Sequence, residues 1–279
     1  MNNTATFKRM KANREKIAMM TAYDAPGASA LNNAGMDLVL VGDSAGMVVH
    51  GYSSTIPVTL DDMVLHTRAV KRGAPHLFTV SDMPFLTYNG DITDTIQAAA
   101  KLMQTGGADA VKVEGAGATI EVISRLVHAG VPVMAHLGLT PQSVGVIGGY
   151  KVQGKNEAEA QQLIEDAVAI EKAGAFALVL ECVPYLLAGY ITSKLSIPVI
   201  GIGAGSETDG QVLVYHDALG IGEGFVPKFV KKYAEVQQEI DKALLQYIKE
   251  VKSSVFPDSN HSFKMDEDLA DRLYGGMTK

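Results

Sequence analysis

Short apolar runs recur along the chain, and most are followed by a segment with helical character. The runs are continuous rather than alternating, which is typical of parallel strands that helices bury on both faces. Eight runs are expected to be strands: residues 17–21, 38–41, 77–80, 110–113, 132–135, 176–180, 198–202 and 212–215.

The segments between these runs carry the signals of helix ends. Residues 60–73 begin near two aspartates and end with Arg72 and Gly73, so the charges complement the helix dipole and glycine closes the C-terminus. Strand and helix alternate about eight times, which predicts an α/β fold with one closed (β/α)8 TIM barrel rather than a doubly wound sheet. The other expected helices are 93–106, 119–130, 157–174 and 228–253.

The composition does not divide the chain, so we expect a single domain over residues 1–279. Two segments depart from the repeating pattern. Residues 137–156 form a long glycine-rich connection, and loops of this length are usually functional or disordered. Residues 264–279 form a polar tail, which we interpret as mobile or as an oligomer contact.

Ionisable residues follow five successive predicted strands. Side chains in a barrel alternate between the interior and the surrounding helices, and this alternation puts Asp43 on the face of Val39 and Val41. A lone aspartate after a strand is more often a helix cap or part of a rim ion pair. Five charged strand ends together instead predict an active site, because barrel enzymes build theirs at this end. The residues are Asp43, Asp82, Lys112 with Glu114, His136 and Glu181.

The side-chain types indicate metal and enolate chemistry. Asp43 and Asp82 are the hard oxygen donors that Mg²⁺ accepts, and Glu114 is either a third ligand or an acceptor that holds a metal-bound water. Such a metal can chelate a 2-oxo acid and make its enolate easier to form. Lys112 would add positive charge beside the developing oxyanion. Glu181 is the best candidate for a general base, because burial in an apolar strand raises the pKa of a carboxylate.

The remaining candidates have a structural and a functional interpretation. His136 could orient a substrate carboxylate, or it could be a structural histidine with satisfied hydrogen bonds. The glycine-rich run 201–205 resembles a phosphate cradle, but a tight turn after the strand is the better interpretation because no lysine follows it. Cys182 lacks a base partner in the sequence and is expected to be a buried, unreactive thiol.

Composition and charge exclude several classes of protein. The 279 residues are 47% hydrophobic and 20% charged, as in a globular protein with a large core. The net charge of -7, from 24 basic and 31 acidic residues, argues against a nucleic-acid-binding protein. No apolar run approaches the length that spans a membrane. The single cysteine excludes an intrachain disulfide and favours a reducing cytoplasm.

Several motifs together closely resemble the ketopantoate hydroxymethyltransferase family, which belongs to the phosphoenolpyruvate/pyruvate barrel superfamily. The resemblance extends from about residue 16 to about residue 263. The motifs are T-A-Y-D (21–24), V-G-D-S (41–44), K-V-E-G (112–115), H-L-G-L-T-P-Q-S (136–143), G-G-Y-K-V-Q-G (148–154), L-E-C-V-P (180–184) and I-G-I-G-A-G (200–205).

The resemblance implies transfer of a one-carbon unit from 5,10-methylenetetrahydrofolate to 3-methyl-2-oxobutanoate. The product, 2-dehydropantoate, is used for pantothenate and coenzyme A synthesis. One Mg²⁺ per subunit would stabilise an enolate. The family also implies a cytoplasmic homo-oligomer, often a decamer. By position in the motifs, Asp43, Asp82 and Glu114 would form the metal site, Glu181 would accept the proton, and Asp43, Ser44, Asp82, Lys112 and His136 would bind the oxo acid.

Two other functions fit part of the pattern. A carbon–carbon lyase or phosphonomutase of the same superfamily would share the metal and enolate chemistry, but we find no lysine–cysteine pair of the kind those enzymes carry near a strand end. A catalytically silent barrel that binds an oxo acid or folate is the other alternative. The presence of both Lys112 and Glu181 argues against it.

Overall fold

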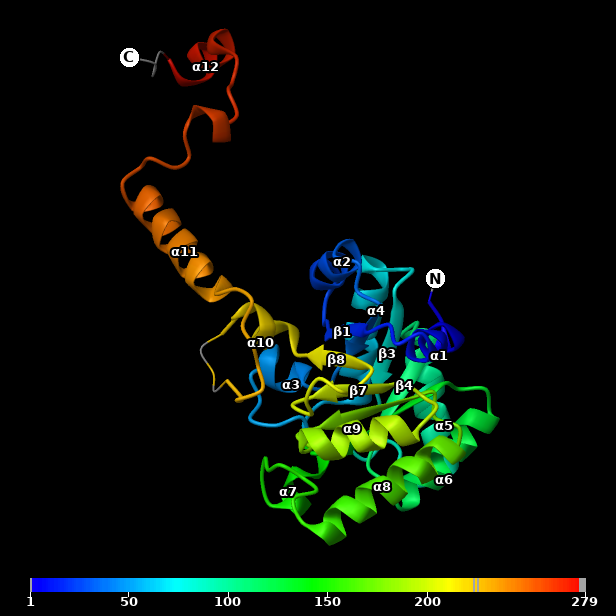
Figure 1. Ribbon diagram of the computed structural model, residues 1–279. Helices are drawn as coiled ribbons and strands as arrows, with labels where there is room; N and C mark the ends of the chain where they lie inside the picture. Colours follow the sequence, from blue (N-terminus) through cyan, green and yellow to red (C-terminus); the bar gives the residue numbers. More distant parts are fainter. Residues whose placement is uncertain (1, 223, 225, 276–279) are drawn as a thin grey trace.

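Eight parallel strands close into a barrel in which each strand pairs with the next in the chain and β8 pairs with β1 (Figure 1). The computed structural model describes residues 2–222, 224 and 226–275. The predicted (β/α)8 TIM barrel is therefore confirmed. The strands are β1 (Ile17–Thr21), β2 (Leu38–Val41), β3 (Phe78–Asp82), β4 (Ala110–Glu114), β5 (Val133–Gly138), β6 (Ala177–Glu181), β7 (Val199–Ile202) and β8 (Gly210–Leu213).

Helices surround most of the barrel. The helix expected over 60–73 is confirmed, and Thr59 and Asp62 cap it by exchanging hydrogen bonds, which satisfies two free N–H groups of its first turn. The helices outside the strands are α2 (Ala25–Asn33), α4 (Leu60–Gly73), α5 (Ile92–Ala100) continued by the π-helix η1 (Lys101–Thr105), α6 (Ala118–His128), α8 (Glu157–Lys172) and α9 (Tyr185–Lys194).

Alternation along the strands divides the apolar residues into two cores. Residues of one parity fill the barrel interior, among them Leu40, Val80 and Val179. Residues of the other parity, such as Val39 and Val111, pack against the helices. A period of two along each strand produces this separation, so the pattern of a strand fixes which of its side chains point inward.

Helix α1 (Thr4–Ala12) closes the N-terminal end of the barrel, which the strand pattern did not predict. Its Phe7 is buried, and its ring lies 5.2 Å from the ring of Phe78 and 6.4 Å from that of Phe176, measured between centroids. Burial of a phenylalanine side chain contributes about 1.5–3 kcal/mol. The opposite end of the barrel carries the charged residues.

The expected alternation of strand and helix is wrong at the end of the barrel. Residues 203–209, all of which the structure describes, join β7 to β8 without a helix. In this connection Gly203 and Gly205 have φ of +64° and +83°, so the glycine-rich run makes turns, as predicted. Strand β8 begins two residues earlier than expected, because its pairing with β1 starts at Gly210.

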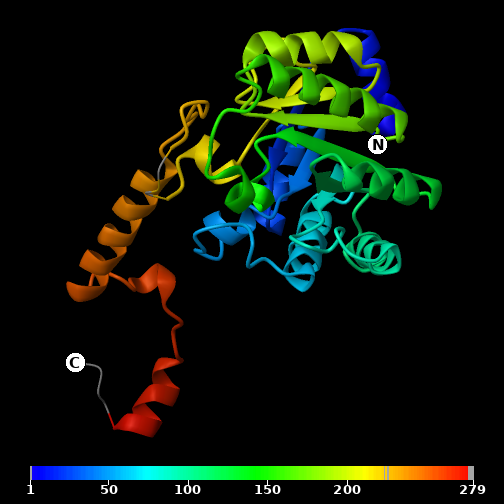
Figure 2. The same cartoon turned by 90° about the horizontal axis from the view of Figure 1, so that it is seen from below.

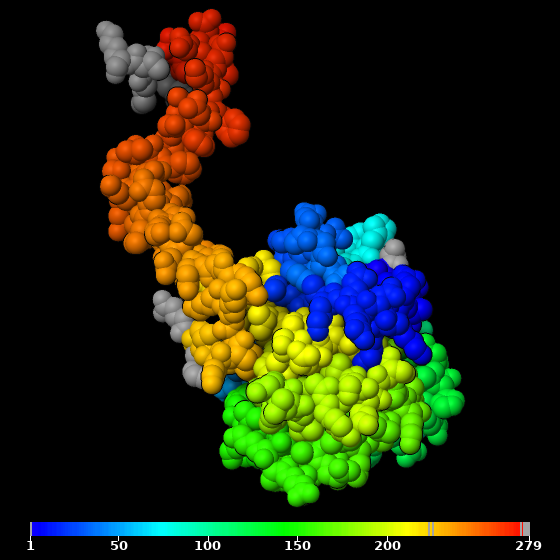
Figure 3. Space-filling view, in the orientation of Figure 1, coloured from blue at the N-terminus to red at the C-terminus, as the bar shows by residue number. Residues whose placement is uncertain are grey.

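The chain after β8 leaves the barrel. Helix α10 (Tyr215–Leu219) is short, and helix α11 (Val236–Lys252) starts later than the 228 predicted. Figures 1 and 2 show α11 and α12 (Glu267–Tyr274) projecting from the barrel in both views, and Figure 3 shows the same arm standing away from the body of the molecule. We call residues 236–275 the C-terminal arm. Among the described residues, no helix has the length and apolar character to cross a membrane.

Candidate active site

The predicted charged residues of β3 to β6 meet at the C-terminal end of the barrel. The strand register pairs Asp82 with Lys112 and Glu114 with His136, so the four side chains lie on neighbouring strands. These positions share the inward parity of residues such as Val80, and each side chain is almost fully buried. The alternation argument is therefore confirmed for these strands.

Asp43 reaches the same site by a different route from the one predicted. Val39 and Val41, whose parity it shares, pack against the helices, so alternation alone would have turned Asp43 away from the interior. Strand β2 ends at Val41, and the turn that follows brings Asp43 to the barrel mouth, where its backbone N–H donates to Asp82 Oδ2 at 3.0 Å. The placement is right, and the reason given for it was wrong.

Lys112 is the cation at the centre of the cluster. Its Nζ lies 2.6 Å from Asp82 Oδ1 and 3.3 Å from Glu114 Oε1. Burial disfavours the charged amine, but the carboxylates of Asp82, Glu114 and Asp43 outweigh this effect and raise the pKa of Lys112 above its ordinary value. The residue therefore stays protonated throughout the physiological pH range.

Glu114 and His136 extend the cluster towards Glu181. Burial alone would raise the pKa of Glu114, but Lys112 and His136 lower it to about 2. His136 Nδ1 lies 3.1 Å from Glu114 Oε1. Burial disfavours the charged imidazole, yet the contact with Glu114 raises the pKa of His136 to about 9, so the ring is positively charged at neutral pH.

The second nitrogen of His136 points towards the predicted base. His136 Nε2 lies 3.3 Å from Glu181 Oε2, and it has no hydrogen-bond partner among the residues that the structure describes. The side chain of Glu181 is 15% exposed, so it is the most accessible carboxylate of the cluster. The Nε2–H group therefore has an ionic contact with Glu181 but donates no hydrogen bond within the described residues, so it is suited to contact a bound substrate.

Ser44 is held by two uncharged residues, Tyr23 and Thr21, which the pattern of charged strand ends could not identify. Its Oγ lies 2.9 Å from the hydroxyl of Tyr23, which accepts a hydrogen bond from Thr21 Oγ1 at 2.8 Å. Burial raises the pKa of Tyr23 above its ordinary value, so the phenol keeps its proton. Tyr23 belongs to the T-A-Y-D motif, and the motif was the only signal that marked it.

Gln142 and Tyr88 also reach the cluster and were not predicted. Both are uncharged and come from the connections that follow β3 and β5, so neither the strand pattern nor the charge pattern could identify them. Gln142 Nε2 donates to Asp43 Oδ2 at 2.8 Å, and the hydroxyl of Tyr88 donates to Gln142 Oε1 at 2.7 Å. For Gln142 the signal was its place in the H-L-G-L-T-P-Q-S motif.

The cluster is compatible with a divalent cation. In the part of the chain that the structure describes, no lysine or arginine pairs with Asp43, although Asp43 is 3% exposed. Burial and the nearby charges of Asp82 and Glu114 raise the pKa of Asp43 well above its ordinary value. This excess of buried negative charge is what a bound Mg²⁺ would neutralise.

The protein alone provides few ligands. Among the described residues, no three histidine, cysteine, aspartate or glutamate side chains form a group that could hold a metal ion. Mg²⁺ commonly uses one or two carboxylates and takes its other ligands from water and substrate oxygens. The pair Asp43 and Asp82 therefore fits Mg²⁺ better than it fits a metal that needs a complete set of protein ligands.

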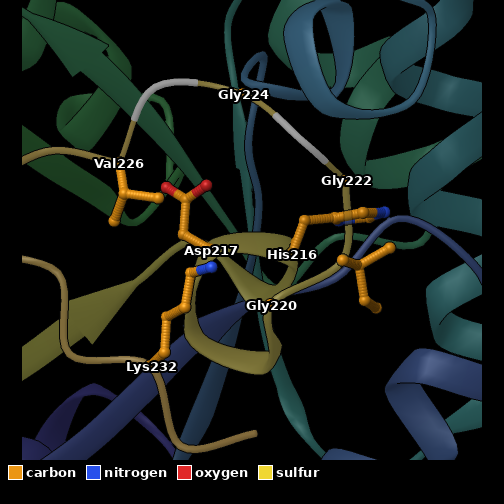
Figure 4. Close-up of a pocket in the computed structure, with 8 residues that line it drawn as sticks. His216, Asp217, Gly220, Gly222, Gly224, Val226 and Lys232 are labelled. Atoms are coloured by element: carbon orange, nitrogen blue, oxygen red, sulfur yellow. The ribbon is translucent and has the colours of Figure 1, made fainter. Parts of the chain in front are cut away.

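Two cavities lie away from the charged cluster. The smaller, of about 30 Å³, is lined by residues around α10, and Figure 4 shows Asp217 and Lys232 on its walls beside His216. That volume suits a water molecule rather than a substrate. The larger is a groove of about 610 Å³ on the outside of the barrel, where Ala18 and Gln211 of β1 and β8 are exposed. No helix covers β8 in the described part of the chain, and the groove follows from this gap.

Cys182 is partly exposed rather than buried, which corrects the sequence-based interpretation. Its low reactivity is nevertheless expected, because partial burial and the charge of Glu181 raise the pKa of the thiol to about 11.

At pH 8, the raised pKa should make alkylation of Cys182 by iodoacetamide about 100-fold slower than alkylation of an unperturbed thiol, because only the thiolate reacts. The rate should increase as the pH approaches 11. Mass spectrometry of timed samples at pH 8 and 10, with a cysteine peptide as control, would measure both rates. Alkylation as fast as that of the peptide would contradict this prediction.

The whole chain matches known proteins. The family model described as "Ketopantoate hydroxymethyltransferase" matches residues 2–259. Proteins named 3-methyl-2-oxobutanoate hydroxymethyltransferase are 59% identical in Halalkalibacterium halodurans and 58% identical in Geobacillus thermodenitrificans, each over 99% of both chains. A relative of the same name in Bacillus pumilus is 55% identical over 100% of both chains.

Solved structures agree on the fold. A phosphoenolpyruvate phosphomutase from Streptomyces platensis has a TM-score of 0.62 at 12% identity, covering 98% of this chain and 96% of its own. A 2,3-dimethylmalate lyase has a TM-score of 0.58 at 16% identity, covering 99% and 95%. At such identities the match shows the fold alone, whereas the family match extends over nearly all of the sequence. The chain belongs to the ketopantoate hydroxymethyltransferase family.

Proposed function

We propose that this protein transfers a hydroxymethyl group from 5,10-methylenetetrahydrofolate to 3-methyl-2-oxobutanoate and so supplies 2-dehydropantoate for pantothenate and coenzyme A synthesis. The observation that carries the proposal is the buried cluster in which an accessible carboxylate, Glu181, lies beside the cation His136, and Glu114 links His136 to the second cation, Lys112. Such a site can remove a proton next to a carbonyl group and stabilise the resulting negative charge. The names of the full-length relatives indicate the same acceptor.

The proposed cofactor is one Mg²⁺ per subunit, held by Asp43 and Asp82 with Glu114 nearby. When bound, it would withdraw electrons from the carbonyl of the oxo acid and make the proton on C3 more acidic. Both oxygens of Glu114 already accept hydrogen bonds, from Lys112, His136 and the backbone of Gln142. Of its two predicted roles, these contacts favour that of an acceptor beside the metal.

Each side chain of the cluster has a separate role in the proposed reaction. Glu181 would accept the proton from C3, and the electron pair left behind would form the new C–C bond to the methylene carbon. Water would supply the hydroxyl oxygen to the same carbon. Both C–N bonds of that carbon would break, and the leaving tetrahydrofolate would take up the C3 proton and one proton of the water on its two nitrogens. Lys112 would stabilise negative charge on the carbonyl oxygen. Ser44, oriented by Tyr23, would contact the substrate carboxylate, as would His136 Nε2, which donates no hydrogen bond within the described residues.

One assay tests the reaction directly. The purified protein is incubated with 3-methyl-2-oxobutanoate and 5,10-methylenetetrahydrofolate, and 2-dehydropantoate is measured by mass spectrometry with added MgCl₂ or with EDTA. We expect product only when the metal is present. Absence of product under both conditions would refute the proposed reaction, and equal product in EDTA would refute the metal requirement alone.

We also propose that the protein is a cytoplasmic homo-oligomer, with ten copies as the family resemblance implies. The supporting observation is the C-terminal arm, which follows β8 at the point where a barrel's last helix would cover β8 and β1. Within the described residues, the groove is therefore not covered by a helix, and α11 stands away from the barrel. One face of α11 exposes Ile240, Leu244, Tyr247, Ile248 and Val251. A second copy is the occupant that fits both.

Substitution of Leu244 and Ile248 by glutamate should dissociate the oligomer, because each charge would have to be buried in an apolar contact. Gln246→Glu, on the other face of α11, is the matched control and should leave the mass unchanged. Light scattering after size exclusion measures the mass of each form. A double variant with the same mass as the unsubstituted protein would rule out the arm as the oligomer contact.

A further inference from the structure

Gln142 connects the long loop after β5 to the charged cluster. It lies in η2 (Pro141–Ser143), and it is 4% exposed. Its side-chain NH₂ group donates to Asp43 Oδ2 at 2.8 Å and to the carbonyl oxygen of Met83 at 3.0 Å. Its backbone N–H donates to Glu114 Oε2 at 3.1 Å. One loop residue therefore contacts groups at the ends of β2, β3 and β4.

Tyr88 determines which way the Gln142 amide faces. The hydroxyl of Tyr88 accepts a hydrogen bond from the backbone N–H of Glu114 at 3.2 Å and donates its own proton to Gln142 Oε1 at 2.7 Å. The NH₂ group must then face Asp43 and Met83. In the flipped amide, an oxygen would face two acceptor oxygens without a proton between them, which is unfavourable in a buried site.

The side chain of Asp43 depends on the Gln142 amide for its hydrogen bond, whereas the neighbouring carboxylates have another donor. Asp82 and Glu114 both receive a hydrogen bond from Lys112. For the side chain of Asp43, the hydrogen-bond donor found within the described residues is Gln142. Removal of the amide would leave a buried carboxylate free to rotate and without a donor.

We propose that Gln142 is a positioning residue: its amide, itself oriented by Tyr88, fixes the Asp43 carboxylate in the orientation that a divalent cation needs. This inference rests on the metal site proposed above. Carboxylate ligands are commonly oriented by hydrogen bonds from groups that do not touch the metal, and loss of such a group lowers metal affinity or activity about 10- to 100-fold. Gln142 itself touches neither the metal nor the reacting atoms.

The test measures binding of Mg²⁺ alone by isothermal titration calorimetry, after the protein has been freed of metal with EDTA. Gln142→Leu keeps the approximate volume and removes both ends of the amide, so the Kd for Mg²⁺ should rise about 10- to 100-fold. Tyr88→Phe keeps the ring and removes the hydroxyl that orients the amide. It should raise the Kd by a smaller factor, about 3- to 10-fold, which corresponds to one hydrogen bond.

Two controls separate positioning from folding. Gln162→Leu removes an exposed glutamine of α8 and should leave the Kd for Mg²⁺ unchanged. Thermal unfolding of each variant without Mg²⁺ reports the structural cost separately, and a purely structural role would lower the Tm without changing the Kd of the folded protein. If Gln142→Leu does not fold, Tyr88→Phe decides the question.

The outcomes are distinguishable. If the unsubstituted protein binds Mg²⁺ and the Gln142 and Tyr88 variants bind it with the same Kd, the inference is overturned and the metal site stands. If the unsubstituted protein does not bind Mg²⁺, the proposed metal site fails and the inference fails with it. A graded loss of affinity, greater for Gln142→Leu than for Tyr88→Phe, would support the inference.

Discussion

Glu181→Gln is expected to slow exchange of the C3 proton of 3-methyl-2-oxobutanoate by about 10²- to 10⁴-fold, the range that a positioned general base contributes. Glutamine has nearly the same size as glutamate but lacks a basic oxygen. Because Glu181 Oε2 lies 3.3 Å from His136 Nε2, the variant should retain the packing of the site and lose the proton acceptor. Exchange is measured by NMR in D₂O with Mg²⁺ and without folate. Without the folate donor the one-carbon transfer cannot occur, so the measured rate reports proton removal alone.

The experiment also distinguishes an enzyme from a silent barrel. The unsubstituted protein should exchange the proton without folate, whereas a barrel that only binds the oxo acid would not. Glu157→Gln, an exposed glutamate in the first turn of α8, is the matched control and should exchange at the original rate. Undiminished exchange in Glu181→Gln would mean that another group is the base.

Lys112→Met is expected to have the largest effect on stability, a loss of about 3–5 kcal/mol in the free energy of unfolding at pH 7 without added metal. Methionine fills a similar volume but leaves Asp82 and Glu114 without the buried cation that both contact. Loss of one partner from a buried ion pair costs more than the pair itself contributes, because the remaining charge cannot be solvated.

The pH dependence of this loss has a definite sign. In the unsubstituted protein the pKa of Glu114 is lowered from 4.5 to about 2, so its contribution to stability is present above about pH 4.5 and disappears as the pH falls through 2. Without Lys112 most of that contribution is missing. The difference in the free energy of unfolding between the two proteins should therefore be greatest near neutral pH and should become smaller below about pH 4.5.

Urea unfolding in EDTA over a series of pH values measures this difference. Lys101→Met is the control, because Lys101 pairs with Asp61 at the surface, where both side chains are largely exposed. Exposed pairs contribute at most about 1 kcal/mol, so this variant should differ little from the unsubstituted protein at any pH. An equal loss in the free energy of unfolding in both lysine variants would contradict the prediction that Lys112 stabilises the buried carboxylates.

The strand pattern predicted much of the candidate site correctly. Four strands end with an ionisable residue of inward parity, and the structure brings these residues together as expected. The prediction succeeded because side chains alternate along a strand, so the sequence of each strand fixes which of them face the interior. The residues concerned are Asp82, Lys112 with Glu114, His136 and Glu181.

The pattern failed where the backbone leaves the strand. Asp43 lies in the turn that follows β2, so the direction of its side chain depends on that turn and not on the alternation. The connection between β7 and β8 lacks the helix that the repeat predicted. Local sequence could not predict the course of the C-terminal arm either, since an amphipathic helix has the same pattern whether its apolar face packs on its own barrel or on another copy.

The sequence by itself determined the barrel, the end at which its charged residues gather and, through its motifs, the family. Only the tertiary structure showed how Asp43 is held, since its contact with Gln142 joins residues 99 positions apart. Hydrogen bonds between distant loops depend on where the folded chain brings those loops, and no local periodicity records that position. For the same reason, Tyr23, Tyr88 and Gln142 became visible as parts of the site only after the strand ends had been assembled.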